Sequence, residues 1–214
     1  MTLDALARRA ASLVPEEGGR AILGICGEPG AGKTTLAEQI LERLRSAHGA
    51  DWAAHVPMDG FHLADVQLAR LGLLDRKGAP ETFDADGYAA LLGRIASGAG
   101  SVVYAPGFER RLEQPLAAAI AVPPEARLII TEGNYLLLGE APWAAARARL
   151  REVWYLDAEP VTRVDRLIRR HIEFGKDPER AREWVLRSDE ANARLIRAGR
   201  DSADYVIAAQ DCTD

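Results

Sequence analysis

One nine-residue segment limits what this chain can fold into more than any other feature: Gly27-Glu28-Pro29-Gly30-Ala31-Gly32-Lys33-Thr34-Thr35. It lies between a short apolar run, Ala21–Cys26, and a segment from Gly32 to about Ala47 whose apolar residues have helical spacing. The run predicts a buried strand, and the spacing predicts a helix. Glycines between them let backbone N–H groups turn inward around phosphate oxygens, and the helix directs its positive end at the same anion. The sequence therefore predicts a phosphate-binding loop that joins a strand to a helix.

All nine residues of this loop, 27–35, are expected to contact a bound nucleotide. Lys33 is expected to reach the β- and γ-phosphates, and the Thr34 hydroxyl to take a coordination place on Mg²⁺. Such a loop occurs in kinases, GTPases and motors alike. The chain has neither the NKxD tetrapeptide of a GTPase nor the LSGGQ-like signature of a transporter ATPase. Its 214 residues predict one domain, 1–214, without the second domain of a motor.

Strand-like and helix-like segments alternate along the rest of the chain. Further strands are expected at Ala53–Met58, Ser101–Tyr104, Arg127–Thr131, Val153–Leu156 and Ala203–Ala208. Helices are expected at 3–13 behind Thr2, from Asp84 to Ser97, after Pro142, at Glu159–Phe174, and at Glu179–Ala198 behind Asp177. This order predicts an α/β fold of three layers with a mainly parallel five-stranded sheet. Ligands are expected at the carboxyl ends of its strands.

Composition excludes several other classes of protein. The 27 basic and 32 acidic residues give a net charge of −5, which argues against a general nucleic-acid binder. The two cysteines, Cys26 and Cys212, belong to no CxxC pattern, so neither a disulfide framework nor a zinc site is expected. The longest apolar run, Leu116–Val122, is far shorter than the ~20 residues that span a bilayer. The N-terminal segment carries charges where an export signal is apolar, so a cytoplasmic location is expected.

Two carboxylates follow predicted strands. Asp59 is expected to leave a strand beside the strand of the phosphate loop and to face the γ-phosphate, where it could accept a proton or hold Mg²⁺. The alternative is an Asp-Gly turn that caps the next helix. Glu132 comes directly after an aliphatic run that predicts a strand. A carboxylate at such a strand end can position Mg²⁺ directly or through water. The alternative for Glu132 is a solvated strand end.

Four segments of the chain recur together in one family: MDGFH at 58–62, RKGAPETFD at 76–84, TEGN at 131–134, and an Arg-rich helix that ends at Gly175-Lys176. In this combination the chain resembles, from about residue 20 to residue 208, the P-loop small-molecule kinases that include phosphoribulokinase, uridine kinase and bacterial pantothenate kinase. The resemblance implies a P-loop NTPase fold with a helical lid and ATP-dependent phosphorylation of a hydroxyl on a small metabolite. It also implies ATP and Mg²⁺ as cofactors, Asp59 as general base and Glu132 as a Mg²⁺-associated acid.

The predicted helix 159–174 carries a stripe of arginines: Arg163, Arg166, Arg169 and Arg170. The first, second and fourth are three or four residues apart and share one face. By the resemblance, a lid over about 163–180 brings arginines to the transferring phosphate, and Gly175 lets the lid turn. The lid arginine is either Arg169 or Arg170. The alternative is a solvated basic face that pairs with acidic residues of the same helix.

Two segments, 76–84 and 106–111, resemble the family's substrate-side loops and carry Arg76, Lys77, Arg110 and Arg111. His62, outside these loops, could also hydrogen-bond the substrate. The alternative is that both loops are ordinary surface turns and that His62 is structural. Only three of the 27 basic residues are lysines, at Lys33, Lys77 and Lys176. A genome that favours Arg codons explains the scarcity, and a lysine that persists can mark a position where the wide Arg fork does not fit. We therefore expect all three near the cleft.

The sequence leaves the substrate open among a sugar such as fructose, a nucleoside such as uridine, and pantothenate. A competing class is a nucleotide-binding regulator or chaperone that hydrolyses ATP without an acceptor. The expected partner is a small molecule that carries a hydroxyl, with no nucleic acid and no membrane. A homodimer is left open.

Overall fold

The computed structural model describes residues 2–98 and 100–211, so that Cys212 lies outside the described residues. The strands are β1 Ala21–Cys26, β2 Ala53–His55, β3 Val103–Glu109, β4 Gln114–Val122, β5 Leu128–Gly133, β6 Glu152–Asp157 and β7 Tyr205–Ala208. The α-helices are α1 Leu3–Ser12, α2 Lys33–His48, α3 Asp65–Leu71, α4 Ala85–Ala96, α5 Trp143–Arg147, α6 Pro160–Glu173, α7 Pro178–Trp184 and α8 Glu190–Ala198. A π-helical turn, Val185–Asp189, joins α7 to α8. None of the helices in the described ranges combines the length and the apolarity needed to cross a bilayer.

The main sheet has five strands in the order β2-β5-β1-β6-β7, and every neighbouring pair is parallel. The predicted α/β class with a parallel five-stranded sheet is therefore confirmed. One expectation about strand order is wrong, because β2 does not lie beside β1. Strand β5 separates them, and Ile25 of β1 is paired in register with Glu132 of β5. Glu132 is thus the acid beside the strand of the phosphate loop, and the segment that carries Asp59 lies one strand farther out.

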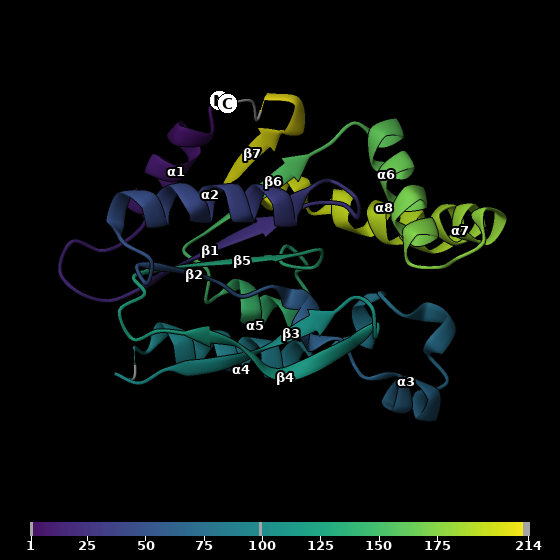
Figure 1. The fold of residues 1–214 in the computed structure, drawn as a ribbon, viewed down its shortest axis with the longest axis horizontal. Coiled ribbons are helices and arrows are strands. Elements are labelled where there is room, and N and C mark those ends of the chain that lie inside the picture. The colour runs from purple at the N-terminus through teal and green to yellow at the C-terminus, as the bar shows by residue number, and fades with distance from the viewer. Residues whose placement is uncertain (1, 99, 212–214) are drawn as a thin grey trace.

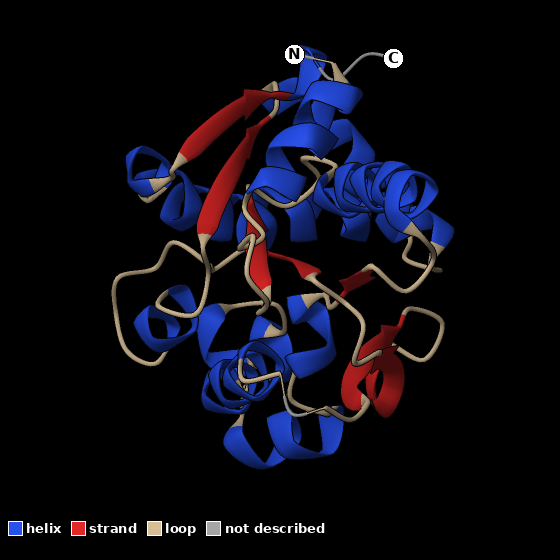
Figure 2. Ribbon diagram, turned by 90° about the vertical axis from the view of Figure 1, so that its left-hand side faces the viewer, coloured by secondary structure: helices blue, strands red, loops and turns tan. Residues whose placement is uncertain are grey.

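Helices cover both faces of this sheet. Ile22 and Cys26 of β1 belong to one buried cluster, whereas Leu23 and Ile25 belong to the other, as the two-residue period of a strand requires. The first cluster includes residues of α4, α5 and α8, and the second includes residues of α1 and α2. Figure 1 shows α2 along one side of the sheet and α4 and α5 along the other, and Figure 2 shows the strands between the helices from a second side.

Three helices begin at the caps that the sequence predicts. The side chain of Thr2 accepts a hydrogen bond from the N–H of Ala5, and that of Asp84 accepts one from Gly87. Asp177 accepts hydrogen bonds from the backbone two and three residues ahead of it. Each cap satisfies an N–H group that the first turn of a helix leaves without a partner.

The structure differs most from the sequence expectation at 101–122. Strand β3 runs on to Glu109, through the expected loop, and pairs antiparallel with β4, Gln114–Val122. The sequence of β4 is QPLAAAIAV, and its alanines favour helix, so local propensity gives little sign of a strand. Pairing with β3 therefore decides its conformation.

Candidate active site

The phosphate loop lies against helix α6 at Gly30. This glycine has a φ of 78°, and a Cβ at its position would come within 2.6 Å of the Arg163 carbonyl oxygen and 2.8 Å of Leu167. Any larger residue would push the loop away from the helix. Helix α2 begins at Lys33, directly behind the loop, so that its free N–H groups face the same space.

Lys33 is buried and held by three oxygen acceptors. Its Nζ atom donates to the carbonyl oxygens of Gly27 at 2.9 Å and Glu28 at 3.1 Å, and to Oδ1 of Asn134 at 2.7 Å. Burial lowers the pKa of Lys33, and the charge of Glu132 opposes this shift. The ammonium is therefore fixed inside the loop that is expected to bind phosphates.

Glu132 lies at the carboxyl end of β5 and contacts the loop through Thr34. The Thr34 hydroxyl donates to Oε1 of Glu132 at 3.0 Å. Burial, followed by the charge of Asp59, raises the pKa of Glu132 to about 7, while Lys33 and Thr34 act in the opposite direction. A hydroxyl beside a buried carboxylate is a donor set that suits Mg²⁺, which retains waters and phosphate oxygens as further ligands. Among the described residues there is no group of three His, Cys, Asp or Glu side chains that could bind a metal alone.

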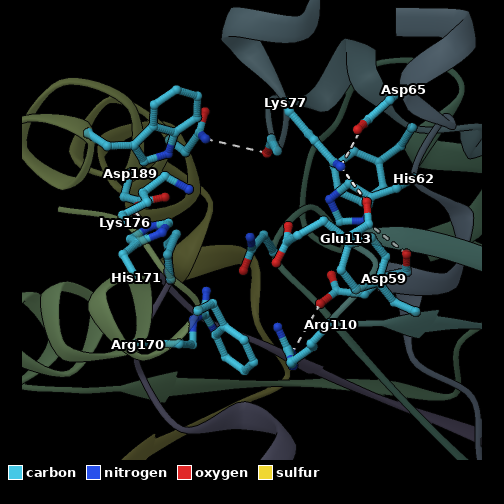
Figure 3. A pocket seen from close by; sticks show the side chains of 18 of the residues that line it. Asp59, His62, Asp65, Lys77, Arg110, Glu113, Arg170, His171, Lys176 and Asp189 are labelled. Atoms are coloured by element: carbon cyan, nitrogen blue, oxygen red, sulfur yellow. Dashed lines mark hydrogen bonds and ion pairs between the residues drawn. The ribbon is translucent and has the colours of Figure 1, made fainter. Parts of the chain in front are cut away.

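Asp59 lies in a short 3₁₀-helix, Met58–Phe61, that follows β2. The side chain of Asp59 is 29% exposed, in contrast to the buried Glu132. Its cationic partner is Arg110, whose Nη2 atom lies 3.7 Å from Oδ2 of Asp59 (Figure 3). Asp59 is therefore the more accessible of the two carboxylates, although both line the loop cavity.

Two cavities meet at this point. The loop cavity, of about 400 Å³, is lined by Lys33, Thr34, Glu132 and Arg166 together with two glycines of the loop, Gly30 and Gly32. The side cavity, of about 360 Å³, lies beyond Asp59 and is lined by residues of the segments around 62–83, 108–113 and 170–192. Six residues line both cavities: Pro29, Asp59, Arg110, Asn134, Arg170 and Phe174. The two cavities thus form one cleft with Asp59 at their junction.

Not every predicted substrate-side residue reaches the cleft. His62, Lys77 and Arg110 line the side cavity. Arg76 and Arg111 line neither cavity. Arg76 forms an ion pair with Glu81 at 2.6 Å, and Arg111 is exposed in the turn between β3 and β4. Neither arginine is therefore brought to the site.

The lysines expected near the cleft lie there. Lys77 and Lys176 both line the side cavity. The Nζ atom of Lys77 contacts Asp65 at 2.7 Å and donates to the carbonyl oxygen of Glu113, and that of Lys176 lies 5.3 Å from the ring of Trp184. In Figure 3 they extend from opposite sides of the cavity.

The four arginines of helix α6 differ in whether they line the cleft. Arg170 lines both cavities and Arg169 lines neither, although both residues are exposed. Of the two arginines between which the sequence left the choice open, Arg170 is the one that lines the cleft. Arg163 is fully buried and ion-paired with Glu28, so it does not share the cleft-facing position of Arg166 and Arg170. It lies on the same face as the buried Leu167, four residues ahead, which is the face that packs onto the protein.

His62 is partly structural. Its Nδ1 atom lies 2.8 Å from the backbone oxygen of Asp59, and its ring packs on Phe83 at 4.0 Å and on Phe108 at 4.7 Å. Burial lowers the pKa of His62. These contacts fix the ring, and its remaining edge contributes to the side cavity.

Comparison with known proteins assigns the chain to a family. No protein-family model matches it. A protein of Schizosaccharomyces pombe named "putative uridine kinase" is 31% identical over 210 residues, which cover 95% of this chain and 89% of the relative. The chain belongs to the uridine kinase/phosphoribulokinase family of P-loop kinases. It is a small-molecule kinase.

Solved structures agree with this assignment. A Silicibacter sp. TM1040 protein described as a "putative fructose transport system kinase" is 37% identical to this kinase, with a TM-score of 0.87 over 97% of this chain and 99% of that one. YFH7 of Saccharomyces cerevisiae has the same fold at 19% identity, with a TM-score of 0.80 over 96% and 98% of the two chains.

Several residues of the kinase cleft were not singled out by the sequence. Asn134 holds Lys33 and lines both cavities, but the sequence noted it only as part of a longer motif. Asn134 belongs to the TEGN segment, so its place after the strand was a usable signal. The α7–α8 region also lines the side cavity, through Trp184, Asp189 and Asn192. Only tertiary packing brings these residues to the cleft, and no local pattern marks them.

Proposed function

We propose that this kinase transfers the γ-phosphate of ATP, bound with Mg²⁺, to a hydroxyl group of a small polar metabolite in the side cavity. The observation that carries the proposal is the junction of the two cavities at Asp59, Arg110 and Arg170. A phosphoryl group that moves from one bound molecule to another must pass such a point. The carboxylate and the two guanidinium groups there are the kinds of group that orient a nucleophile and offset developing charge.

The loop cavity fits the phosphates of ATP. Its lining contains four cations and three carboxylates: Lys33, Arg110, Arg166 and Arg170, with Asp59, Glu132 and Glu173. Lys33 already binds three oxygen atoms, as it would bind phosphate oxygens. Thr34 and Glu132 would hold Mg²⁺, which supplies charge neutralisation and orientation of the phosphates when bound. The cavity beside the loop at Thr35, Gln39 and Leu156 would take the rest of the nucleotide.

Asp59 is the group proposed to act on the acceptor. A hydroxyl is a poor nucleophile, and its proton must leave as the bond to phosphorus forms. A partly exposed carboxylate at the junction can accept that proton and orient the oxygen. Arg110 and Arg170 would then face the transferring group, whose charge spreads over its equatorial oxygens. The segment about 163–180 would act as a lid, and the positive φ of 93° at Gly175 allows the sharp turn between α6 and α7.

The lining of the side cavity favours a polyhydroxyl acceptor, so a sugar such as fructose stands first, before uridine and pantothenate. Many hydrogen-bonding side chains face this space, including Asp65, Lys77, Asp189 and Asn192. A sugar offers a hydroxyl to each such group. Trp184 and Phe108 supply apolar surfaces on which the C–H face of a sugar could pack.

A panel of acceptors tests the proposal. ADP release is measured with ATP·Mg²⁺ alone and with fructose, uridine, cytidine, pantothenate or ribulose 5-phosphate. Release that depends on one acceptor, with formation of its phosphorylated product, is the expected result. Equal release with and without every acceptor would instead favour an ATP-hydrolysing regulator and would overturn the proposed transfer.

Glu132→Gln is expected to raise the Mg²⁺ concentration needed for half-maximal rate by roughly 10–100-fold, the usual cost of removing a supporting group at a metal site. The amide keeps the shape of the side chain but loses the charge that attracts the ion. The rate is measured against Mg²⁺ at fixed ATP. Glu81→Gln is the matched control, because Glu81 pairs with Arg76 outside the cleft. An unchanged Mg²⁺ profile in Glu132→Gln would show that this carboxylate does not serve the metal.

A further inference from the structure

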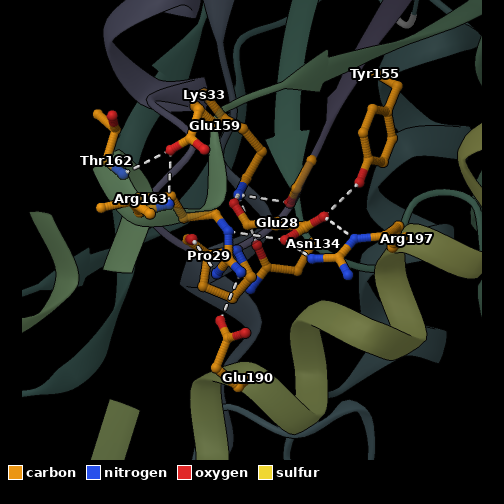
Figure 4. Close-up of polar contacts among 12 residues, drawn as sticks. Glu28, Pro29, Lys33, Asn134, Tyr155, Glu159, Thr162, Arg163, Glu190 and Arg197 are labelled. Carbon is orange, nitrogen blue, oxygen red and sulfur yellow. Dashed lines mark hydrogen bonds and ion pairs between the residues drawn. The ribbon is translucent and has the colours of Figure 1, made fainter. Parts of the chain in front are cut away.

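Glu28 is a charged residue at the second position of the phosphate loop. Its carboxylate makes contacts with two arginines from distant parts of the chain (Figure 4). Oε1 accepts from Arg197 Nε at 2.7 Å, and Oε2 accepts from Arg197 Nη2 at 2.9 Å. Oε2 also lies 2.8 Å from Nε of Arg163, and the Tyr155 hydroxyl lies 3.3 Å from Oε1. Side chains of β6, α6 and α8 thus surround the Glu28 carboxylate.

Arg163 extends this contact into a four-residue charge cluster, which consists of Glu28, Arg163, Glu190 and Arg197. Nη2 of Arg163 donates to Oε1 of Glu190 at 2.5 Å, and Nη1 donates to the backbone oxygen of Pro29 at 3.4 Å. The side chain of Arg163 has no exposed surface, and that of Glu28 is 7% exposed. The two positive and two negative charges of the cluster balance. Buried charges are retained only when they are paired in this way.

The charge cluster joins three elements that must be arranged together. Glu28 belongs to the phosphate loop, Arg163 to α6, and Glu190 and Arg197 to the two ends of α8. The loop also touches α6 directly, because the backbone oxygen of Arg163 lies against Gly30. Arg166 and Arg170, which line the loop cavity, lie one and two helical turns beyond Arg163 on α6. The position of Arg163 therefore sets where these two guanidinium groups point.

We propose that Glu28 is a positioning residue, which fixes α6 to the phosphate loop through Arg163 and α8 through Arg197 and thereby aims Arg166 and Arg170 at the transferring phosphate. This inference rests on the proposed transfer of a phosphoryl group. The residues that line the loop cavity do not include Glu28, whose carboxylate is held by Arg163 and Arg197. A negative side chain in a loop that binds an anion repels it unless its charge is neutralised, and the two arginines neutralise it. Glu28 thus acts through the helices and not by contact with ATP.

The test compares Glu28→Gln, Arg197→Gln and Arg197→Lys with the wild-type enzyme. If Glu28→Gln folds poorly, the Arg197 variants provide the test. The Arg197 side chain is 47% exposed, so that its removal disturbs little packing. We expect kcat at saturating ATP to fall roughly 10–100-fold in the two Gln variants, because displacement of a catalytic group by about 1 Å has effects of that size. The Kd of ADP·Mg²⁺, measured by calorimetry, is expected to stay within about threefold, since the backbone and Lys33 still bind the phosphates. Arg197→Lys keeps the charge and is expected to recover part of kcat.

Arg200→Gln is the matched control. Arg200 forms an exposed ion pair with Asp157 at 2.9 Å just after α8, without contact to the loop, so wild-type kcat is expected. Unchanged kcat in both Glu28→Gln and Arg197→Gln would overturn the inference. A loss confined to ADP·Mg²⁺ affinity would overturn it as well, because Glu28 would then serve nucleotide binding.

Hydrogen exchange separates failure of this inference from failure of the proposed function. With ADP·Mg²⁺ bound, amides of 163–170 are expected to be protected in the wild type and in Arg200→Gln, and to exchange faster in the two Gln variants of the charge cluster. This readout needs no acceptor. If the acceptor panel yields no product but the variants loosen α6, the proposed transfer is wrong and the anchoring of α6 stands. If product forms and exchange over 163–170 is the same in all variants, the anchoring is wrong.

Discussion

Replacing Lys33 with alanine is expected to lower kcat by about 10²–10³-fold, the usual cost of removing one charged or hydrogen-bonding group that stabilises a transition state. Phosphoryl transfer depends on positioning and on neutralisation of charge more than on covalent chemistry by the protein. Lys33 is the cation that the loop itself surrounds, with its ammonium group held by Gly27, Glu28 and Asn134. Lys33 is the one lysine that lines the loop cavity, so no neighbouring ammonium group can replace it. The measurement is the steady-state rate at saturating ATP and acceptor.

Lys33→Arg is the informative companion variant. It keeps the positive charge, but a wide guanidinium must enter a buried site shaped for a compact ammonium, so we expect little recovery of kcat. Thermal unfolding of both variants checks that the fold persists. A folded Lys33→Ala enzyme with wild-type turnover would contradict the role of the loop, and full activity in Lys33→Arg would contradict the explanation for lysine at this position.

Features that depend on local sequence were predicted well. The strand Ala21–Cys26, the loop behind it and the start of α2 at Lys33 follow from an apolar run, three glycines and a helical period. The caps at Thr2, Asp84 and Asp177 follow from single side chains that satisfy nearby N–H groups. In each case the stabilising contacts join residues only a few positions apart.

Features that depend on distant contacts were not predicted. The insertion of β5 between β1 and β2 is a matter of strand order, which no local pattern encodes. The buried ion pairs of Arg163 require Glu28 and Glu190, which lie far away in the sequence. The helical period predicted that Arg163, Arg166 and Arg170 share one face of α6. It could not show that one arginine would be buried under the loop while the other two line the cleft.

The order of the strands also bears on how the two acids divide their work. Because β5 lies beside β1, Glu132 is close enough to the loop to accept a hydrogen bond from Thr34. Asp59 is carried one strand farther out and one 3₁₀ turn beyond the end of β2, at the junction with the side cavity. Burial raises the pKa of Glu132 to about 7, and a bound cation would favour its charged form. The geometry therefore favours Glu132 for the metal and Asp59 for the acceptor. The sequence-based expectation that the strand of Asp59 lies beside the strand of the phosphate loop was wrong.

Asp59→Asn is expected to lower kcat by about 10²–10⁴-fold, the usual contribution of a general base, while ATP·Mg²⁺ binding stays within a few-fold. The amide can still orient the acceptor hydroxyl, but it cannot take the proton that must leave as the new bond forms. Because Arg110 lies 3.7 Å from the carboxylate, loss of the charge also leaves this guanidinium without its nearest acid. The kcat and the calorimetric Kd for ATP·Mg²⁺ are compared with those of Asp51→Asn, a change at an exposed residue ahead of β2. Near-normal kcat in Asp59→Asn would remove Asp59 as the base. A Mg²⁺ profile shifted as far as that of Glu132→Gln would instead assign both acids to the metal, and the proton would then need another acceptor.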